Sequence, residues 1–140
     1  MKGCCILLFA PLLIFICTAF ILVATCTSNA HDFLYHQIVN FTFVSAPSFS
    51  DLLIVSDINL TSEFYLIQKM GHLASFGLLY FFLFSWIKKP GTAFLYCGLF
   101  ACSTEVLQLY FKRNGRLFDV GIDLAGICIA YLISKYLYKK

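Results

Sequence analysis

Apolar residues dominate four long stretches of the chain, and polar or charged residues gather in the segments between them. The stretches run over residues 4–25, 64–87, 92–111 and 117–137. The first has no charged residue, and at 1.5 Å per residue it would form a helix of about 33 Å. That length crosses a bilayer core of about 30 Å. The pattern therefore predicts an all-α fold, an integral membrane bundle of four transmembrane helices.

The segments between the stretches set the organisation of the chain. Residues 88–91 and 112–116 are short turns that contain Pro-Gly and Asn-Gly. Short turns make the last three helices antiparallel neighbours. We divide the chain into an N-terminal transmembrane helix (1–25), an extracytoplasmic loop (26–63) and a three-helix membrane region (64–140).

The first stretch has a second interpretation, a cleaved signal peptide. The sequence around Cys26 partly resembles a lipoprotein cleavage box, but Thr25 is a poor residue in front of the cysteine. The apolar run is also long for a signal. We therefore favour a retained helix.

The loop differs from the rest of the chain in its charges. It carries Asp32, Asp51, Asp57 and Glu63 but no Lys or Arg. Its apolar pieces at residues 41–44 and 52–55 could form short strands or interfacial segments. With the N-terminus in the cytoplasm, six basic residues lie inside and four outside, which agrees with the positive-inside rule. We expect a multi-pass protein of the cell membrane with both termini cytoplasmic.

Composition supports the membrane assignment. The chain is 61% hydrophobic and 12% charged, whereas soluble domains carry about 25% charged residues. No basic run interleaved with aromatic residues indicates nucleic acid as a partner. The cysteines lie mostly in apolar runs, where they act as small hydrophobes, and their spacing fits no zinc pattern. We predict no metal site and no cofactor.

Seven polar residues interrupt the last three apolar stretches. Counted at 1.5 Å per residue from the inner boundary of each helix, they fall in one outer layer about 10 Å thick. Within each helix they are three or four residues apart and so share one face. Polar faces at membrane depth turn inward, which predicts a polar pocket that opens outward. The seven residues are Lys69, His72, Glu105, Gln108, Arg116, Asp119 and Asp123.

The same residues resemble the pattern of the VanZ-like family. The chain has Lys69-x-x-His72, then Glu105-x-x-Gln108, then Arg116-x-x-Asp119-x-x-x-Asp123-x-x-Gly126. Asp123 stands where the family usually has Asn, and the match covers about residues 64–135. The family takes its name from a protein associated with low-level resistance to teicoplanin. The resemblance implies a membrane protein linked to the cell envelope and to antibiotic tolerance.

Each polar residue has a binding role and a structural role to consider. The Arg116 guanidinium suits a phosphate or carboxylate at headgroup depth, or it could form an internal ion pair with Asp119 or Glu105. His72 could act as a general acid or base. We favour a structural hydrogen bond from His72 to Glu105. The carboxylates could together bind a divalent cation, but pairing of Asp119 and Asp123 with basic side chains is the favoured interpretation.

We expect the pocket to bind an anionic lipid or a lipid-linked cell-wall precursor. The alternatives are a membrane enzyme that acts on a lipid phosphate, a transport subunit and a purely structural polar network. A homo-oligomer or an envelope protein could be a further partner. Small residues spaced four apart, such as Gly71 with Ser75 and Gly126 with Ala130, predict close helix packing.

Overall fold

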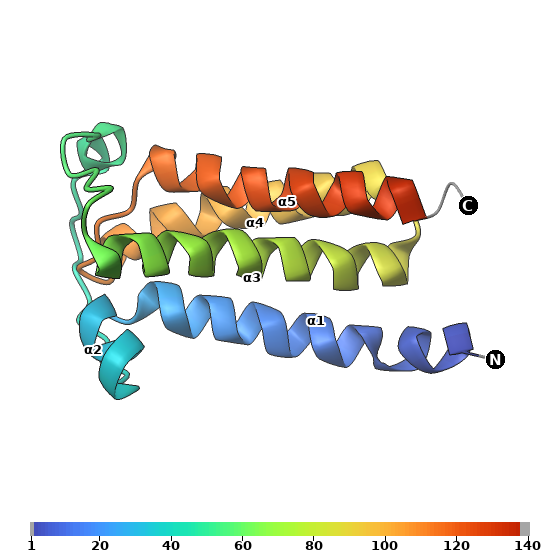
Figure 1. Ribbon diagram of the computed structural model, residues 1–140. Helices are drawn as coiled ribbons and strands as arrows, with labels where there is room; N and C mark the ends of the chain where they lie inside the picture. Colours follow the sequence, from blue (N-terminus) through green and yellow to red (C-terminus); the bar gives the residue numbers. More distant parts are fainter. Residues whose placement is uncertain (1, 138–140) are drawn as a thin grey trace.

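The predicted helices form at nearly their predicted bounds in the computed structural model, which describes the backbone of residues 2–137 and the side chains of residues 9–137 (Figure 1). In this part of the chain, four helices are long and apolar enough to cross a membrane. They are α1 (Lys2–Cys26), α3 (Glu63–Ile87), α4 (Pro90–Tyr110) and α5 (Leu117–Leu137). The prediction of an all-α bundle with four such helices is confirmed.

Local sequence explains where the helices begin and end. Ser62 precedes α3, and its hydroxyl accepts a hydrogen bond from the backbone N–H of Tyr65 at 3.4 Å. Lys88 takes the left-handed conformation that ends α3, with φ of 59°. Pro90 then starts α4, where its missing N–H and fixed φ suit the first turn. The α3–α4 turn therefore folds back within two residues.

The closest helix packing joins α3 to α5. A Cβ atom at Gly126 would collide with the backbone carbonyl of Leu73 on α3. A Cβ at Gly77 would lie 3.2 Å from the carbonyl oxygen of Gly126. The two backbones thus approach through their glycines, as expected for small residues at membrane helix crossings. The predicted packing role of Gly126 is confirmed, whereas Gly71 has open space around it.

Helix α1 packs against the unit formed by α3, α4 and α5 and shares its core. Ile21 of α1 is 2% exposed and belongs to the same apolar core as Phe76 and Ile127. The outward faces of the long helices are apolar as well, and Phe15 and Leu132 are 70% and 62% exposed. Such faces need an apolar surrounding, which a bilayer supplies.

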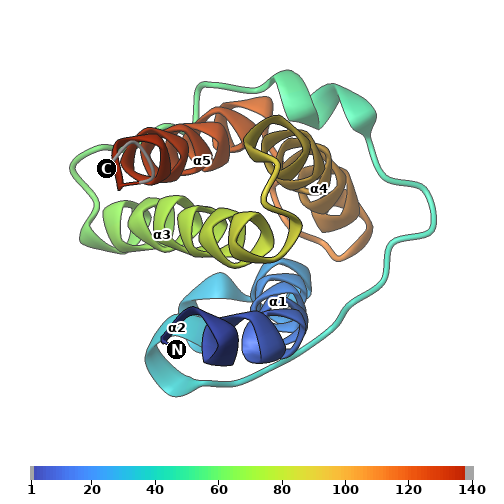
Figure 2. The same cartoon turned by 90° about the vertical axis from the view of Figure 1, so that its right-hand side faces the viewer.

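The connection between α1 and α3 wraps around one end of the bundle. It contains the short helix α2 (Ala30–His36) and the 3₁₀ helix η1 (Phe49–Leu53). Figure 2 shows it passing outside α1 and α4 before it reaches α5 and returns to α3. The backbone N–H of Val44 donates to the carbonyl of Tyr110 at 2.8 Å, which ties the connection to the end of α4. We call this the loop end of the bundle.

The loop differs from the sequence analysis in two ways: one of its two alternatives, short strands, is wrong, and a short helix forms that the sequence did not predict. No strand forms in residues 27–62, because the extended piece at residues 41–44 packs its aromatic rings on Tyr110 and Phe111 instead of pairing with another strand. Helix α2 was not predicted. Its start is fixed by Asn29, whose Oδ1 accepts hydrogen bonds from the backbone N–H groups of His31 and Asp32.

The end of the bundle opposite the loop is where helix α1 begins and helix α5 ends (Figure 1).

Candidate functional site

All seven polar residues predicted for the site lie toward the loop end of α3, α4 and α5, but they form two groups. Four of them are packed between the helices, and three border a cavity beneath the loop. The buried cluster consists of His72, Glu105, Gln108 and Asp123, and the cavity-lining group of Lys69, Arg116 and Asp119.

Glu105 is the centre of the buried cluster. Its Oε1 accepts a hydrogen bond from Gln108 Nε2 at 2.8 Å. Its Oε2 accepts one from the backbone N–H of Arg116 at 2.9 Å. Glu105 and Gln108 are 0% and 1% exposed. Both carboxylate oxygens are therefore satisfied inside the protein, and they join α4 to the start of α5.

This contact depends on a close approach at Gly115. A Cβ atom there would collide with the backbone carbonyl of Glu105. The N–H groups of Phe111 and Arg113 both donate to the carbonyl of Gln108 at 3.0 Å. These bonds close the last turn of α4 and bring the Asn-Gly turn back over it. The turn that the sequence predicts thus delivers the Arg116 N–H to Glu105.

His72 bonds to α5 and not to α4. Its Nδ1 lies 3.1 Å from Asp123 Oδ1 and 4.0 Å from Glu105 Oε1, and only the shorter distance is a hydrogen bond. The expected hydrogen bond from His72 to Glu105 is wrong. Because α3 packs most closely against α5, Asp123 reaches the imidazole first.

Three side chains of the cluster could together hold a metal ion. One ligand atom each from His72, Glu105 and Asp123 lies within 4.8 Å of the other two. Asp123 Oδ2 is buried and has no hydrogen-bond partner in the described part of the chain. Both oxygens of Glu105, however, already accept hydrogen bonds. A second group with suitable spacing, at residues 31, 32 and 36, is largely exposed on α2.

Lys69 and Asp119 form an ion pair at the edge of the cavity. Lys69 Nζ lies 2.6 Å from each carboxylate oxygen of Asp119. The two side chains are 13% and 4% exposed. The ammonium also lies 4.6 Å from the centre of the Tyr65 ring, a cation–π contact. The favoured pairing of Asp119 with a basic side chain is confirmed, and its partner is Lys69.

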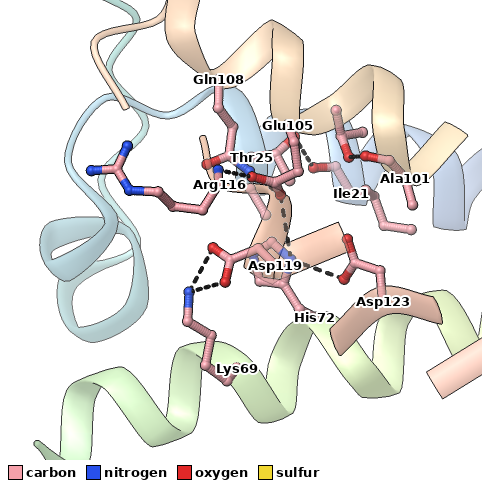
Figure 3. A network of polar contacts seen from close by, with 12 residues as sticks. Ile21, Thr25, Lys69, His72, Ala101, Glu105, Gln108, Arg116, Asp119 and Asp123 are labelled. Carbon is pink, nitrogen blue, oxygen red and sulfur yellow. Dashed lines mark hydrogen bonds and ion pairs between the residues drawn. The ribbon is translucent and has the colours of Figure 1, made fainter. Parts of the chain in front are cut away.

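Arg116 turns away from the buried cluster and toward the loop, as Figure 3 shows. Its Nε and Nη2 both lie 2.9 Å from Asp57 Oδ2. Its Nη1 donates to the backbone carbonyl of Asp51 at 2.8 Å. The expected ion pairs with Asp119 or Glu105 are wrong for the guanidinium, because the acidic loop folds over the end of α5 and supplies Asp57.

Arg113 completes the basic lining and was not among the predicted site residues. Its Nη1 donates to the backbone carbonyls of Thr27 at 2.7 Å and Ala24 at 3.3 Å. These groups belong to the last turn of α1 and the residue after it, where carbonyls lack helical partners. Burial lowers the pKa of the Arg113 guanidinium, which Glu105 and Asp119 partly oppose. A basic residue in a turn gave no sign of this contact, since its partner is 86 residues away.

The charged side chains surround a cavity of about 590 Å³ between the loop, α3 and the α4–α5 turn. We call it the polar cavity. Its volume lies within the range of ~300–1,000 Å³ typical of small-molecule sites. Four cationic side chains line it against two carboxylates. These six residues are Lys69, Lys112, Arg113, Arg116, Asp57 and Asp119.

The comparisons with known proteins agree with the resemblance drawn from the sequence. The model of the VanZ/LLP1 family matches residues 4–138, so it includes the first helix and the loop. The chain is 39% identical over 114 residues to the uncharacterized membrane protein YwnJ of Bacillus subtilis (strain 168). This alignment covers 80% of each chain. No solved structure matches the chain.

Proposed function

Since this chain belongs to the VanZ/LLP1 family and is a membrane protein, we propose that it binds the phosphate headgroup of an anionic lipid in its polar cavity. The lipid is a phospholipid or a lipid-linked cell-wall precursor, which share that phosphate chemistry. The loop end faces the exterior of the cell, and both termini are cytoplasmic. The loop between α1 and α3 contains no Lys or Arg, which supports this orientation.

The excess of cations over carboxylates in the polar cavity is the observation that carries the proposal. Asp57 and Asp119 each pair with one cation, Arg116 and Lys69. Arg113 contacts backbone carbonyls and Lys112 is exposed. Two positive charges therefore have no carboxylate among the described residues of the cavity, and a phosphate would balance them.

The site's depth suits a headgroup rather than a lipid tail. The cavity lies at the ends of α3 and α5 and beneath the loop, where a spanning helix meets the headgroup layer. Arginine and lysine at this level bind phosphate through charge-assisted hydrogen bonds. If the lipid is a cell-wall precursor, its capture would alter teicoplanin tolerance, which links this proposal to the family resemblance.

Removal of one cavity charge should test the proposal without disturbing the fold. Lys112 is exposed at the cavity rim, so Lys112→Gln removes a charge and no packing. One surface charge contributes about 1 kcal/mol to anionic-lipid binding, or about fivefold in affinity. The matched control is Lys89→Gln, which removes the same charge at the other end of α4.

The measurement is binding of phosphatidylglycerol to the purified protein in phosphatidylcholine nanodiscs, followed by native mass spectrometry. We expect Lys112→Gln to lower the bound fraction and Lys89→Gln to leave it unchanged. Equal effects of the two substitutions, or no preference of the wild type for the anionic lipid, would remove the basis for the proposal. Lipids that co-purify with the wild type would identify the headgroup.

The hydrogen bond between His72 and Asp123 favours a second candidate, hydrolysis of a lipid phosphate ester. A histidine oriented by a carboxylate can take a proton from water as the water oxygen attacks phosphorus, and can return it to the leaving alcohol. His72 and Asp123 have this relation, at 3.1 Å. Phosphate release from undecaprenyl phosphate by the wild type, and its loss in His72→Gln, would establish the reaction.

A further inference from the structure

A second cavity lies against the polar cavity, between α1, α2 and α3. Its volume is about 120 Å³, and apolar side chains make up most of its lining. We call it the apolar groove. Its principal lining residues are Phe20, Ile21, Phe33, Leu34, Ile67 and Phe76. Phe20 and Ile67 are 53% and 39% exposed, so the groove lies next to the outer surface of α1 and α3.

The two cavities adjoin each other. Both are lined by Ala30, Phe64, Gln68 and Arg113. A molecule that occupies the polar cavity would therefore have an apolar space directly beside it, at the depth of the spanning helices. A phospholipid joins a phosphate and a hydrocarbon chain in one molecule, so its two parts match the two cavities.

Several polar atoms at the groove already have partners in the protein. The Thr25 hydroxyl donates to the backbone carbonyl of Ile21 at 2.8 Å. His72 Nδ1 is bonded to Asp123, and the Arg113 guanidinium is held by carbonyls of α1. The groove therefore offers an occupant apolar contact and little hydrogen bonding, which suits a hydrocarbon chain.

We propose that the apolar groove holds a segment of one hydrocarbon chain of the lipid whose phosphate occupies the polar cavity. This inference rests on the proposed function. At about 30 Å³ for each water-sized group, the groove takes roughly four methylene groups. The rest of the chain continues into the bilayer between α1 and α3. The ligand is thus an anionic lipid held at both its headgroup and the first part of its chain.

Gly71 provides a direct way to fill the groove. It lines the groove, and a Cβ atom added there has nothing within 4 Å. Gly71→Phe would therefore add a bulky ring at the wall of the groove without a collision at its Cβ. Gly121 on α5 is the matched control, because its added Cβ also has nothing within 4 Å and it lines neither cavity. Both glycines are exposed within membrane-spanning helices.

Two probes that share one headgroup can distinguish the groove proposal from the proposed phosphate binding in the polar cavity. Oleoyl lysophosphatidate carries a phosphate and one chain, and glycerol phosphate carries the same headgroup alone. Their binding is measured to the wild type, Gly71→Phe and Gly121→Phe in phosphatidylcholine nanodiscs. We expect Gly71→Phe to weaken the binding of oleoyl lysophosphatidate about tenfold, or about 1.4 kcal/mol, because the added ring clashes with the hydrocarbon chain. Glycerol phosphate should bind all three proteins equally.

The outcomes are distinct. If the wild type binds neither probe, the proposed function fails and the groove proposal fails with it. If the wild type binds both probes but Gly71→Phe and Gly121→Phe behave alike, only the groove proposal is overturned. A loss of glycerol phosphate binding in Gly71→Phe would also overturn the groove proposal, because the substitution would then disturb headgroup binding and not only contact with the hydrocarbon chain.

Crosslinking provides a test that needs no substitution. Oleoyl lysophosphatidate with a diazirine near the start of its chain is irradiated with the wild-type protein, and the modified residues are mapped by mass spectrometry. We expect labels on Phe20, Phe33 or Ile67 in excess over the lipid-facing Leu132 of α5. Equal labelling of both faces would overturn the proposal.

Discussion

The buried cluster and the polar cavity both place carboxylates at the same end of the bundle, but they satisfy these polar groups differently. In the cluster, both oxygens of Glu105 accept hydrogen bonds from within the protein. At the cavity, each carboxylate pairs with one cation and further cations are left over. The cluster therefore satisfies the Glu105 carboxylate within the protein, while the cavity keeps positive charge that no carboxylate of its described lining balances.

The difference follows from position along the helices. One turn deeper in the bundle, helix packing excludes water, and a charge or polar group without a partner there is costly. Nearer the loop, side chains extend from the ends of the helices into a space that the loop covers only in part. Carboxylates thus have different energetic roles within about 10 Å along the helices.

Loss of Glu105 should have the largest effect on stability. Glu105→Leu would leave the Gln108 amide and the Arg116 N–H without their acceptor, at a cost of about 3–5 kcal/mol. The measurement is unfolding by denaturant in detergent micelles. Val106→Leu, on the exposed side of the same helix, should change stability by less than about 0.5 kcal/mol. Similar effects of both substitutions would show that the cluster has no special structural role.

Substitutions of the Lys69–Asp119 pair should come next. Because the two side chains are 13% and 4% exposed, Lys69→Met or Asp119→Asn should each cost about 2 kcal/mol. The double variant should cost less than the sum, since it leaves no charge unpaired. Additive costs would mean that the pair is not coupled and that its charges are solvated separately.

Spacing within the helices was enough to predict most of the fold and the site's location. Long apolar stretches require helices in a bilayer, because only helices satisfy all of their own backbone groups there. The depths of Lys69, Glu105 and Asp119 follow directly from the rise per residue. All three do lie toward one end of their helices, the end that meets the loop, as predicted.

Sequence spacing could not predict which side chains become partners. The sequence analysis expected Glu105 as the partner of His72, but the structure has Asp123. This partner depends on how closely Gly126 allows α5 to approach α3. The partner of Arg116 lies in the loop, 59 residues away, and no periodicity relates the two positions. Contacts that depend on tertiary packing or on a loop's path leave no regular pattern in the sequence.

A substitution of Arg113 should have an intermediate effect. Arg113→Met would remove a hydrogen bond to Thr27 and a longer one to Ala24, at a cost of about 1–2 kcal/mol. The last turn of α1 should then exchange its amide hydrogens faster, which mass spectrometry in micelles can follow. Lys112→Met, one residue earlier and exposed, is the control. Equal exchange in both variants would show that Arg113 does not hold the end of α1.

Substitution of Arg116 should have the smallest effect on overall stability and a clear local effect. Arg116→Gln keeps the backbone N–H that Glu105 needs but loses the guanidinium contacts to Asp57. Because Asp57 is 41% exposed, the pair should contribute less than about 1 kcal/mol. Amide exchange at residues 51–58 should nevertheless rise, and Asp57→Asn should produce the same rise. If instead Arg116→Gln unfolds the protein while Asp57→Asn does not, the guanidinium supports the cluster beneath it, and the separation between the two regions is wrong.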